Sequence, residues 1–232
     1  QEYLDRLEYE LEVIITMGFV GYFLIVADFI NWSKQNNIMI GPGRGSAAGS
    51  LVCWSLGITA VDPIKYHLLF ERFLNPGRVG TFPDIDVDIQ KDKRHLVLEY
   101  VRNKYGQEYV AQIGTFGQFK AKAAIRGSAR VLNLPIKMAD ELTAIYPEPE
   151  HGKPISLSRA FEKVKKLREI RDSDTDKGRI LRLATQMEDR VSQFGIHAAG
   201  VVIGNRPLTH TVPLARGRND EVVTQWNMHN VE

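Results

Sequence analysis

The sequence has very little cysteine, since Cys53 is the one thiol among its 232 residues. A single thiol cannot form an intrachain disulfide or a cysteine metal cluster, so a reducing, cytoplasmic setting is expected. Because Cys53 lies next to Trp54, we predict that it is a small buried hydrophobic residue and not a nucleophile.

Long apolar runs are also missing. The most apolar stretch, residues 13–27, is shorter than the ~20 residues that cross a bilayer, and it contains Gly18 and Gly21. It lacks the basic leader and the cleavage site of a signal peptide. We therefore expect no membrane partner.

An excess of charge of one sign is absent as well. The formal net charge is only +2, while 44% of the residues are hydrophobic and 25% are charged. These fractions are ordinary for a globular chain with a real core. The overall charge does not identify a nucleic-acid-binding protein, so the distribution of charge has to be considered.

Apolar residues recur with helical spacing in the segments 4–18, 22–33, 47–56, 62–75 and 92–105. Strand-like patterns occur at 38–40, 81–89, 109–114, 199–203 and 222–226. Helical periodicity dominates from about 116 to 193. The sequence therefore predicts an α/β (α+β) chain in which a sheet-based domain is interrupted by a helical insertion.

Three aspartates, Asp84, Asp86 and Asp88, alternate with apolar residues. The strand period of two places them on one face, where like charges repel unless a cation neutralises them. Their hard oxygen ligands favour Mg²⁺ or Mn²⁺, and two such ions are the usual machinery of nucleotidyl transfer. The alternative is a solvated face of an edge strand, and the spacing does not say which two aspartates bind metal.

A glycine-rich turn, Gly41-Pro42-Gly43-Arg44-Gly45-Ser46, precedes a predicted helix. Glycines let backbone amides approach a phosphate, and Arg44 and Ser46 can bind phosphate oxygens. The Gly-Lys-Ser/Thr of a P-loop is missing. The residues 43–48 also fit G-x-G-x-x-A, with Asp62 near the position of a ribose-binding acid, so a dinucleotide-binding oxidoreductase module is an alternative. A tight turn with close helix packing is a third interpretation.

Four cations, Lys120, Lys122, Arg126 and Arg130, occur within 120–130 without an intervening acid. Lys122, Arg126 and Arg130 are four residues apart and share one helical face, where like charges weaken an isolated helix. A polyanionic partner such as a DNA backbone would explain the pattern. A solvated surface is the alternative.

Taken together, these motifs resemble the α subunit of bacterial DNA polymerase III, a C-family replicative DNA polymerase. The matching segments, in the order of that family, are 17–19 with 22–26, 41–46, 69–76, 83–88, 115–126 and 197–203. They cover most of the chain outside the block near 133–190.

The resemblance implies a Pol β-like nucleotidyltransferase palm, formed by 1–116 and 194–232, with a helical thumb inserted at 117–193. It implies that Asp84 and Asp86 are catalytic and hold two Mg²⁺ ions, with Asp88 in support. The residues implied to bind the triphosphate of the incoming dNTP are Arg44, Gly45, Ser46, Arg72 and His197. The helix of Lys120, Lys122, Arg126 and Arg130 would face the primer–template DNA.

The resemblance also implies the reaction, which is nucleotidyl transfer from a dNTP to a primer 3′-hydroxyl in the parent protein. The sequence departs from the family pattern in one respect. The family has a third catalytic aspartate, in a strand expected after residue 232. The fingers, the clamp-binding region and the upstream PHP domain are not found in these residues, and other replisome subunits would bind through such regions. We therefore expect the isolated chain to have little or no polymerase activity.

Overall fold

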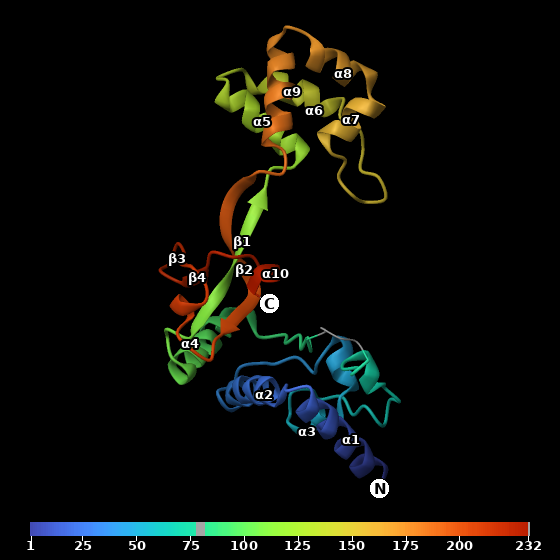
Figure 1. Cartoon of the computed structure of the whole chain (residues 1–232), viewed down its shortest axis with the longest axis vertical. Coiled ribbons are helices and arrows are strands. Elements are labelled where there is room, and N and C mark those ends of the chain that lie inside the picture. Colours follow the sequence, from blue (N-terminus) through green and yellow to red (C-terminus); the bar gives the residue numbers. More distant parts are fainter. Residues whose placement is uncertain (78–81, 232) are drawn as a thin grey trace. The chain divides into compact units, whose positions relative to one another are not determined.

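The computed structural model describes residues 1–77 and 82–231, which form two compact units, Gln1–Gln107 and Glu108–Glu232 (Figure 1). Helices and strands are mixed, which confirms the α/β (α+β) composition predicted from the sequence. The hydrogen-bonded sheet of the described residues lies in the second unit. Each unit is described by itself.

The first unit is mainly helical. Its elements are α1 (Glu2–Thr16), α2 (Val20–Gln35), the 3₁₀ helix η1 (Gly45–Gly49), α3 (Leu51–Ser55), η2 (Phe70–Arg72), η3 (Lys91–Lys93) and α4 (Arg94–Tyr105). No single helix in the described part of the chain is long and apolar enough to cross a membrane. The pair α1 and α2 has that length and composition together, but it is bent by 113°.

The core of the first unit joins the apolar faces of α1 and α2 to α3 and η2. Phe23, Ile30, Cys53 and Phe70 are among its buried side chains. Burial raises the pKa of the Cys53 thiol to about 12, so the thiol stays protonated at neutral pH. The prediction that Cys53 is a buried hydrophobic residue is confirmed.

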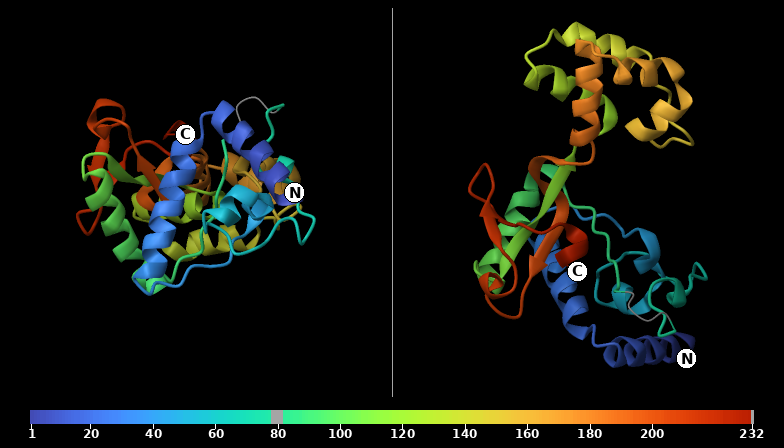
Figure 2. Two further views of the ribbon diagram at one scale, coloured as in Figure 1. Left: turned by 90° about the horizontal axis from the view of Figure 1, so that it is seen from below. Right: turned by 45° about the horizontal axis from the view of Figure 1, so that its top comes forward.

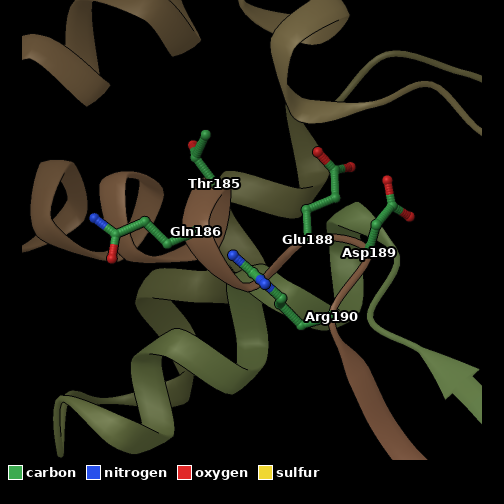
Figure 3. A pocket seen from close by; sticks show the side chains of 5 residues that line it. All are labelled: Thr185, Gln186, Glu188, Asp189 and Arg190. Carbon is green, nitrogen blue, oxygen red and sulfur yellow. The ribbon is translucent and has the colours of Figure 1, made fainter.

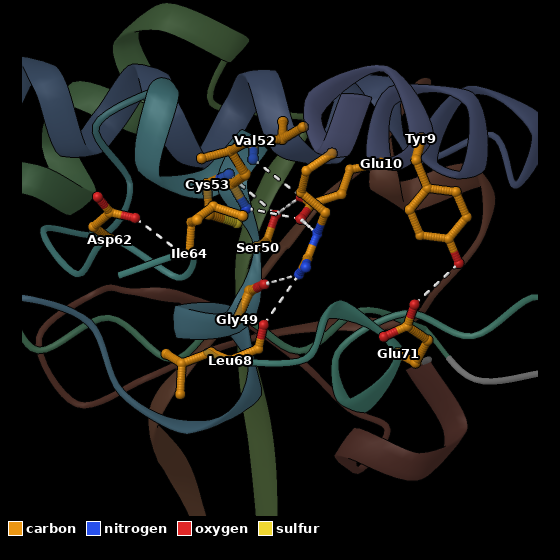
Figure 4. A network of polar contacts seen from close by, with 12 residues as sticks. Tyr9, Glu10, Gly49, Ser50, Val52, Cys53, Asp62, Ile64, Leu68 and Glu71 are labelled. Atoms are coloured by element: carbon orange, nitrogen blue, oxygen red, sulfur yellow. Dashed lines mark hydrogen bonds and ion pairs between the residues drawn. The ribbon is translucent and has the colours of Figure 1, made fainter. Parts of the chain in front are cut away.

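A buried carboxylate ties α1 to the loop that follows the glycine-rich turn (Figure 4). Glu10 is fully buried and accepts hydrogen bonds from Arg6 Nε at 2.7 Å and Ser50 Oγ at 2.8 Å. It also accepts the backbone N–H groups of Leu51 at 3.0 Å and Val52 at 3.1 Å. These amides begin α3 and have no partner within the helix, so Glu10 satisfies them from another element.

A second polar cluster joins α2 to α4. Asp28 accepts hydrogen bonds from the hydroxyls of Tyr100 and Tyr105 at 3.0 Å, and it forms an ion pair with Lys104. Partial burial raises the pKa of Asp28, but the three donors outweigh it and lower the pKa overall. The Trp32 ring stacks on Tyr100 with 4.2 Å between ring centroids.

The second unit contains a sheet with the strand order β2-β1-β4-β3. Its strands are β1 (Val110–Gln118), β2 (Val191–Ile203), β3 (Leu214–Arg216) and β4 (Val222–Thr224). β1 pairs with β2 antiparallel and with β4 in parallel. Both long strands continue beyond the rest of the sheet as a two-stranded ribbon that leads to a group of helices (Figure 2).

The helices between β1 and β2 have their own core. They are α5 (Ala121–Val131), α6 (Ile136–Ala144), α7 (Leu157–Lys163), α8 (Lys165–Asp172) and α9 (Asp176–Met187), and the short α10 (Met228–Val231) follows β4. Ile125, Leu157, Leu167 and Leu181 are fully buried among them. The helical character expected for 116–193 is confirmed for 121–187, whereas 116–118 and 191–193 belong to β1 and β2. The assignment of these helices as a thumb and the domain limits stay predictions.

Several predicted elements are wrong in detail. The helix expected over 47–56 is broken at Ser50, whose φ of −97° and ψ of 123° are extended. The helix expected from Asp62 is replaced by turns and η2, because the Asp62 carboxylate accepts the N–H groups of Ile64 and Lys65 in a local turn. The strands expected at 38–40 and 81–89 meet in one antiparallel bridge, Ile40–Ile89, and the described residues 82–89 form no ladder; residue 81 lies outside the described residues.

Replacing Glu10 with alanine should lower the free energy of unfolding by about 3 kcal/mol, because the buried first amides of α3 and the half-buried Arg6 lose their partner. Urea unfolding of the chain followed by circular dichroism measures this. Glu8→Ala is the matched control, since Glu8 is exposed on the same helix. Equal stability of the two variants would contradict the role of Glu10.

Candidate functional site

The acidic segment, residues 82–90, is extended and packs on one side only. Asp84, Asp86 and Asp88 are exposed, whereas Ile85 and Val87 pack against the core of the first unit. The alternation predicted from the sequence is therefore confirmed, although the segment lacks a strand partner along most of its described length.

The glycine-rich turn lies directly against this segment. The N–H of Gly41 donates to the carbonyl oxygen of Asp88 at 2.9 Å, and a Cβ on Gly41 would lie 2.9 Å from the Cβ of Asp88. Gly43 has φ +104°, and a Cβ there would meet Thr59 Cγ2 at 2.8 Å. Glycine is thus required in the turn both for its backbone conformation and for the close approach of its neighbours.

Arg44 connects the turn to the acidic segment through its side chain. Its guanidinium lies 3.2 Å from Asp86 and 3.5 Å from Asp88. It therefore relieves part of the repulsion expected between the aligned aspartates. The three side chains are about half exposed, with 58%, 48% and 61% of their surface accessible, so solvent screens both pairs. No local sequence pattern predicts this contact, because it joins positions about 40 residues apart.

The donor set of the acidic segment fits a hard divalent cation. Across residues 1–77 and 82–231, no group of three or more Asp, Glu, His or Cys side chains converges closely enough to hold a metal ion. Mg²⁺, however, usually binds through one or two carboxylates and completes its shell with water and substrate oxygens. Asp84 and Asp86 supply two exposed carboxylates from adjacent outward positions. Their role as metal ligands stays a prediction.

The other predicted nucleotide-binding residues of the first unit lie near the turn. Gly45 has φ +65° and Ser46 is half-buried in η1. Arg72 is exposed in η2, which packs against η1. The helix after the turn is shorter than the sequence predicts, since η1 spans only Gly45–Gly49, so its dipole contributes less than a full α-helix would.

The dinucleotide-binding alternative is not supported by the surroundings of the turn. A Rossmann turn joins a parallel strand to a long helix, whereas this turn joins an antiparallel bridge to a 3₁₀ helix. Asp62, the expected ribose-binding acid, accepts a hydrogen bond from the Tyr3 hydroxyl at 2.7 Å in addition to its local turn. The G-x-G-x-x-A match is therefore coincidental.

His197 lies in the second unit, in an irregular part of β2. The pairing of β1 with β2 shifts between Gln112 and Gly114, so residues 197–200 bulge out of the ladder. His197 Nδ1 accepts the backbone N–H groups of Ala199 at 3.2 Å and Gly200 at 2.8 Å. In the neutral ring, the proton is consequently on Nε2.

The basic face of α5 is exposed as predicted, but it is partly neutralised. Arg126 pairs with Asp140 at 3.0 Å and Lys120 pairs with Asp189 at 2.9 Å. Lys122 lies over the ring of Tyr146, and Arg130 is exposed near the end of the helix. Aspartates from other segments thus supply the negative charge that residues 120–130 lack. The role of these cations in DNA binding stays a prediction.

A depression of about 640 Å³ lies where α9 passes into β2 (Figure 3). Thr185, Gln186, Glu188, Asp189 and Arg190 line it. Burial raises the pKa of Glu188, whose two oxygens accept the N–H of Leu157 at 3.0 Å. The lining includes none of the predicted site residues.

Comparison with known proteins gives one consistent family. The model of the bacterial DNA polymerase III alpha NTPase domain matches residues 1–232. DNA polymerase III subunit alpha of Aquifex aeolicus is 47% identical over 252 residues, which cover 100% of this chain and 22% of that protein. The Thermus aquaticus subunit is 48% identical over 99% of this chain and 19% of its own length. The chain therefore spans about a fifth of the length of these relatives.

Gly43→Ala should destabilise the first unit by about 2 kcal/mol or more, because its φ is strained for alanine and Thr59 blocks the new methyl group. Gly21→Ala is the control. Gly21 lies in α2 with open space around its Cβ position, so alanine should be neutral or stabilise by up to about 1 kcal/mol. Urea midpoints compare the two variants, and an unchanged midpoint for Gly43→Ala would contradict the geometry of the turn.

Proposed function

Since the chain belongs to the bacterial DNA polymerase III alpha family, we propose that it forms part of the catalytic core of a replicative DNA polymerase. The reaction is attack of a primer 3′-hydroxyl on the α-phosphate of a dNTP, with release of pyrophosphate. The observation that carries this proposal is the contact of Arg44, on the glycine-rich turn, with Asp86 and Asp88. The contact supports the proposal because it joins the guanidinium that we propose binds phosphate to the carboxylate segment that we propose binds metal.

Within this proposal, Asp84 and Asp86 are the metal ligands and Asp88 supports them. Two Mg²⁺ ions, or Mn²⁺, would supply activation of the attacking hydroxyl and charge neutralisation at the triphosphate. Arg44 donates to phosphate oxygens, and the turn at Gly45 and Ser46 offers backbone and hydroxyl donors. Such donors stabilise the charge that develops on the transferred phosphoryl group.

The remaining parts have assigned roles in the same proposal. Arg72 assists at the triphosphate, and His197 is a further candidate for nucleotide binding. The sheet of the second unit belongs to a Pol β-like palm, and α5 to α9 form the thumb. The exposed cations of α5 face the backbone of the primer–template. Further replisome subunits bind to other parts of the polymerase, and the 232-residue chain by itself does not extend primers.

The metal-ligand assignment predicts that Asp84→Asn and Asp86→Asn each lower primer extension by a factor on the order of 10³ or more, because each removes one charged ligand. The measurement is single-turnover extension by the full-length polymerase that contains this chain, in Mg²⁺. Asp88→Asn should reduce the rate by about ten-fold or less, since Asp88 only supports the site.

Primer–template affinity serves as the control for these variants, and it should stay unchanged. Near-normal extension by Asp84→Asn or Asp86→Asn would show that the wrong carboxylates were chosen. Robust templated extension by the isolated 232-residue chain would contradict its predicted inactivity.

The DNA-binding assignment predicts a change in salt dependence. Replacing Lys122 and Arg130 together with alanine should weaken primer–template binding, and the slope of log K against log salt should become less steep by about 2. Replacing Lys165 and Lys166, two exposed cations of α8, is the matched control and should leave the slope unchanged. Equal slopes for both double variants would exclude α5 as the phosphate-binding face.

A further inference from the structure

The first turn of α2 supports the acidic segment from behind. The ring of Phe19, which precedes α2, packs edge-on against Phe82 with 5.8 Å between centroids. Three residues further along, in the first turn of α2, the hydroxyl of Tyr22 accepts the backbone N–H of Ile85 at 3.1 Å. Two residues three apart at the start of α2 thus contact two residues three apart on the acidic segment.

Hydrogen bonds hold the acidic segment unevenly along its length. At its C-terminal end, Asp88 accepts the Gly41 N–H at 2.9 Å and Gln90 donates to the Met39 carbonyl at 3.0 Å. Between residues 82 and 87, the described backbone hydrogen bond is the one from Ile85 to Tyr22. It falls on the residue between Asp84 and Asp86, so one side-chain hydroxyl fixes the peptide that joins the two predicted metal ligands.

Tyr22 is suited to this task because its ring is anchored. The ring is half-buried and packs against the core of the first unit, where it lies edge-on to Phe23. The phenol oxygen accepts the Ile85 N–H through a lone pair, so this hydrogen bond needs no change in the state of the hydroxyl.

We propose that Tyr22 is a positioning residue that fixes the direction in which Asp84 and Asp86 present their carboxylates. This inference rests on the proposed function of these aspartates. The two carboxylates sit on a segment without a strand ladder, so their geometry depends on the anchors behind them. Loss of one anchor keeps both carboxylates in the chain but orients them less tightly. Small displacements of reacting groups lower reaction rates strongly.

The test is Tyr22→Phe in the full-length polymerase, because phenylalanine keeps the ring in the core and removes only the hydroxyl. We expect kcat for primer extension to fall roughly ten- to hundred-fold. The Mg²⁺ concentration for half-maximal rate should rise roughly five-fold, since ligand preorganisation is lost. The dissociation constant for primer–template should stay within two-fold of wild type.

Tyr100→Phe is the matched control, because it deletes a hydroxyl that bonds to Asp28 between α2 and α4 in the same unit. It should lower thermal stability without changing the Mg²⁺ midpoint. An unchanged kcat and midpoint for Tyr22→Phe would overturn the inference, as would the same shift in both variants. Asp86→Asn in the same assay separates the two proposals: if it loses extension while Tyr22→Phe does not, only the role of Tyr22 fails.

Discussion

The glycine-rich turn depends on the buried carboxylate of Glu10 for its position. Four donors from α1, Ser50 and the start of α3 converge on this group, and Arg6 also donates to the carbonyl oxygens of Gly49 and Leu68. Because η1 ends at Gly49, these bonds fix the chain immediately after the turn. The bridge between Ile40 and Ile89 fixes it immediately before the turn. The turn is therefore held at both ends, and Arg44 projects from between them.

Burial patterns were easier to predict from the sequence than hydrogen-bond partners. The period-two pattern of 84–89 correctly gave the exposed and packed residues, because alternation reports one-sided packing whether or not a neighbouring strand is present. The same pattern gave no information on the partners, which are single contacts from Tyr22, Met39 and Gly41. The helix signal at Asp62 failed because the same carboxylate that caps helices also closes short turns.

Contacts between distant segments account for the remaining differences. The pattern at 199–203 did not predict residues 191–198 of β2, because this part begins in an exposed ribbon, where strands need no apolar alternation. The basic stripe of α5 was correctly placed on one exposed face, but Asp140 and Asp189 reach it from other segments. The pairing of Arg44 with Asp86 likewise depends on the fold. A local pattern contains the charges of one segment only, so neutralisation by other segments cannot be read from it.

The hydrogen bonds of Glu10 and the ion pairs of Arg44 differ in how much free energy it costs to break them. The Glu10 carboxylate is fully buried, and removing its donors would leave a desolvated charge, so the network behaves as a fixed support. The pairs of Arg44 with Asp86 and Asp88 are about half exposed, and pairs of this kind contribute only about 0–1 kcal/mol. Under the proposed function, a guanidinium held so weakly would leave the carboxylates for a triphosphate at little cost. The buried support under the turn would keep the backbone in place while these charged groups changed partners, as phosphoryl transfer at this site would require.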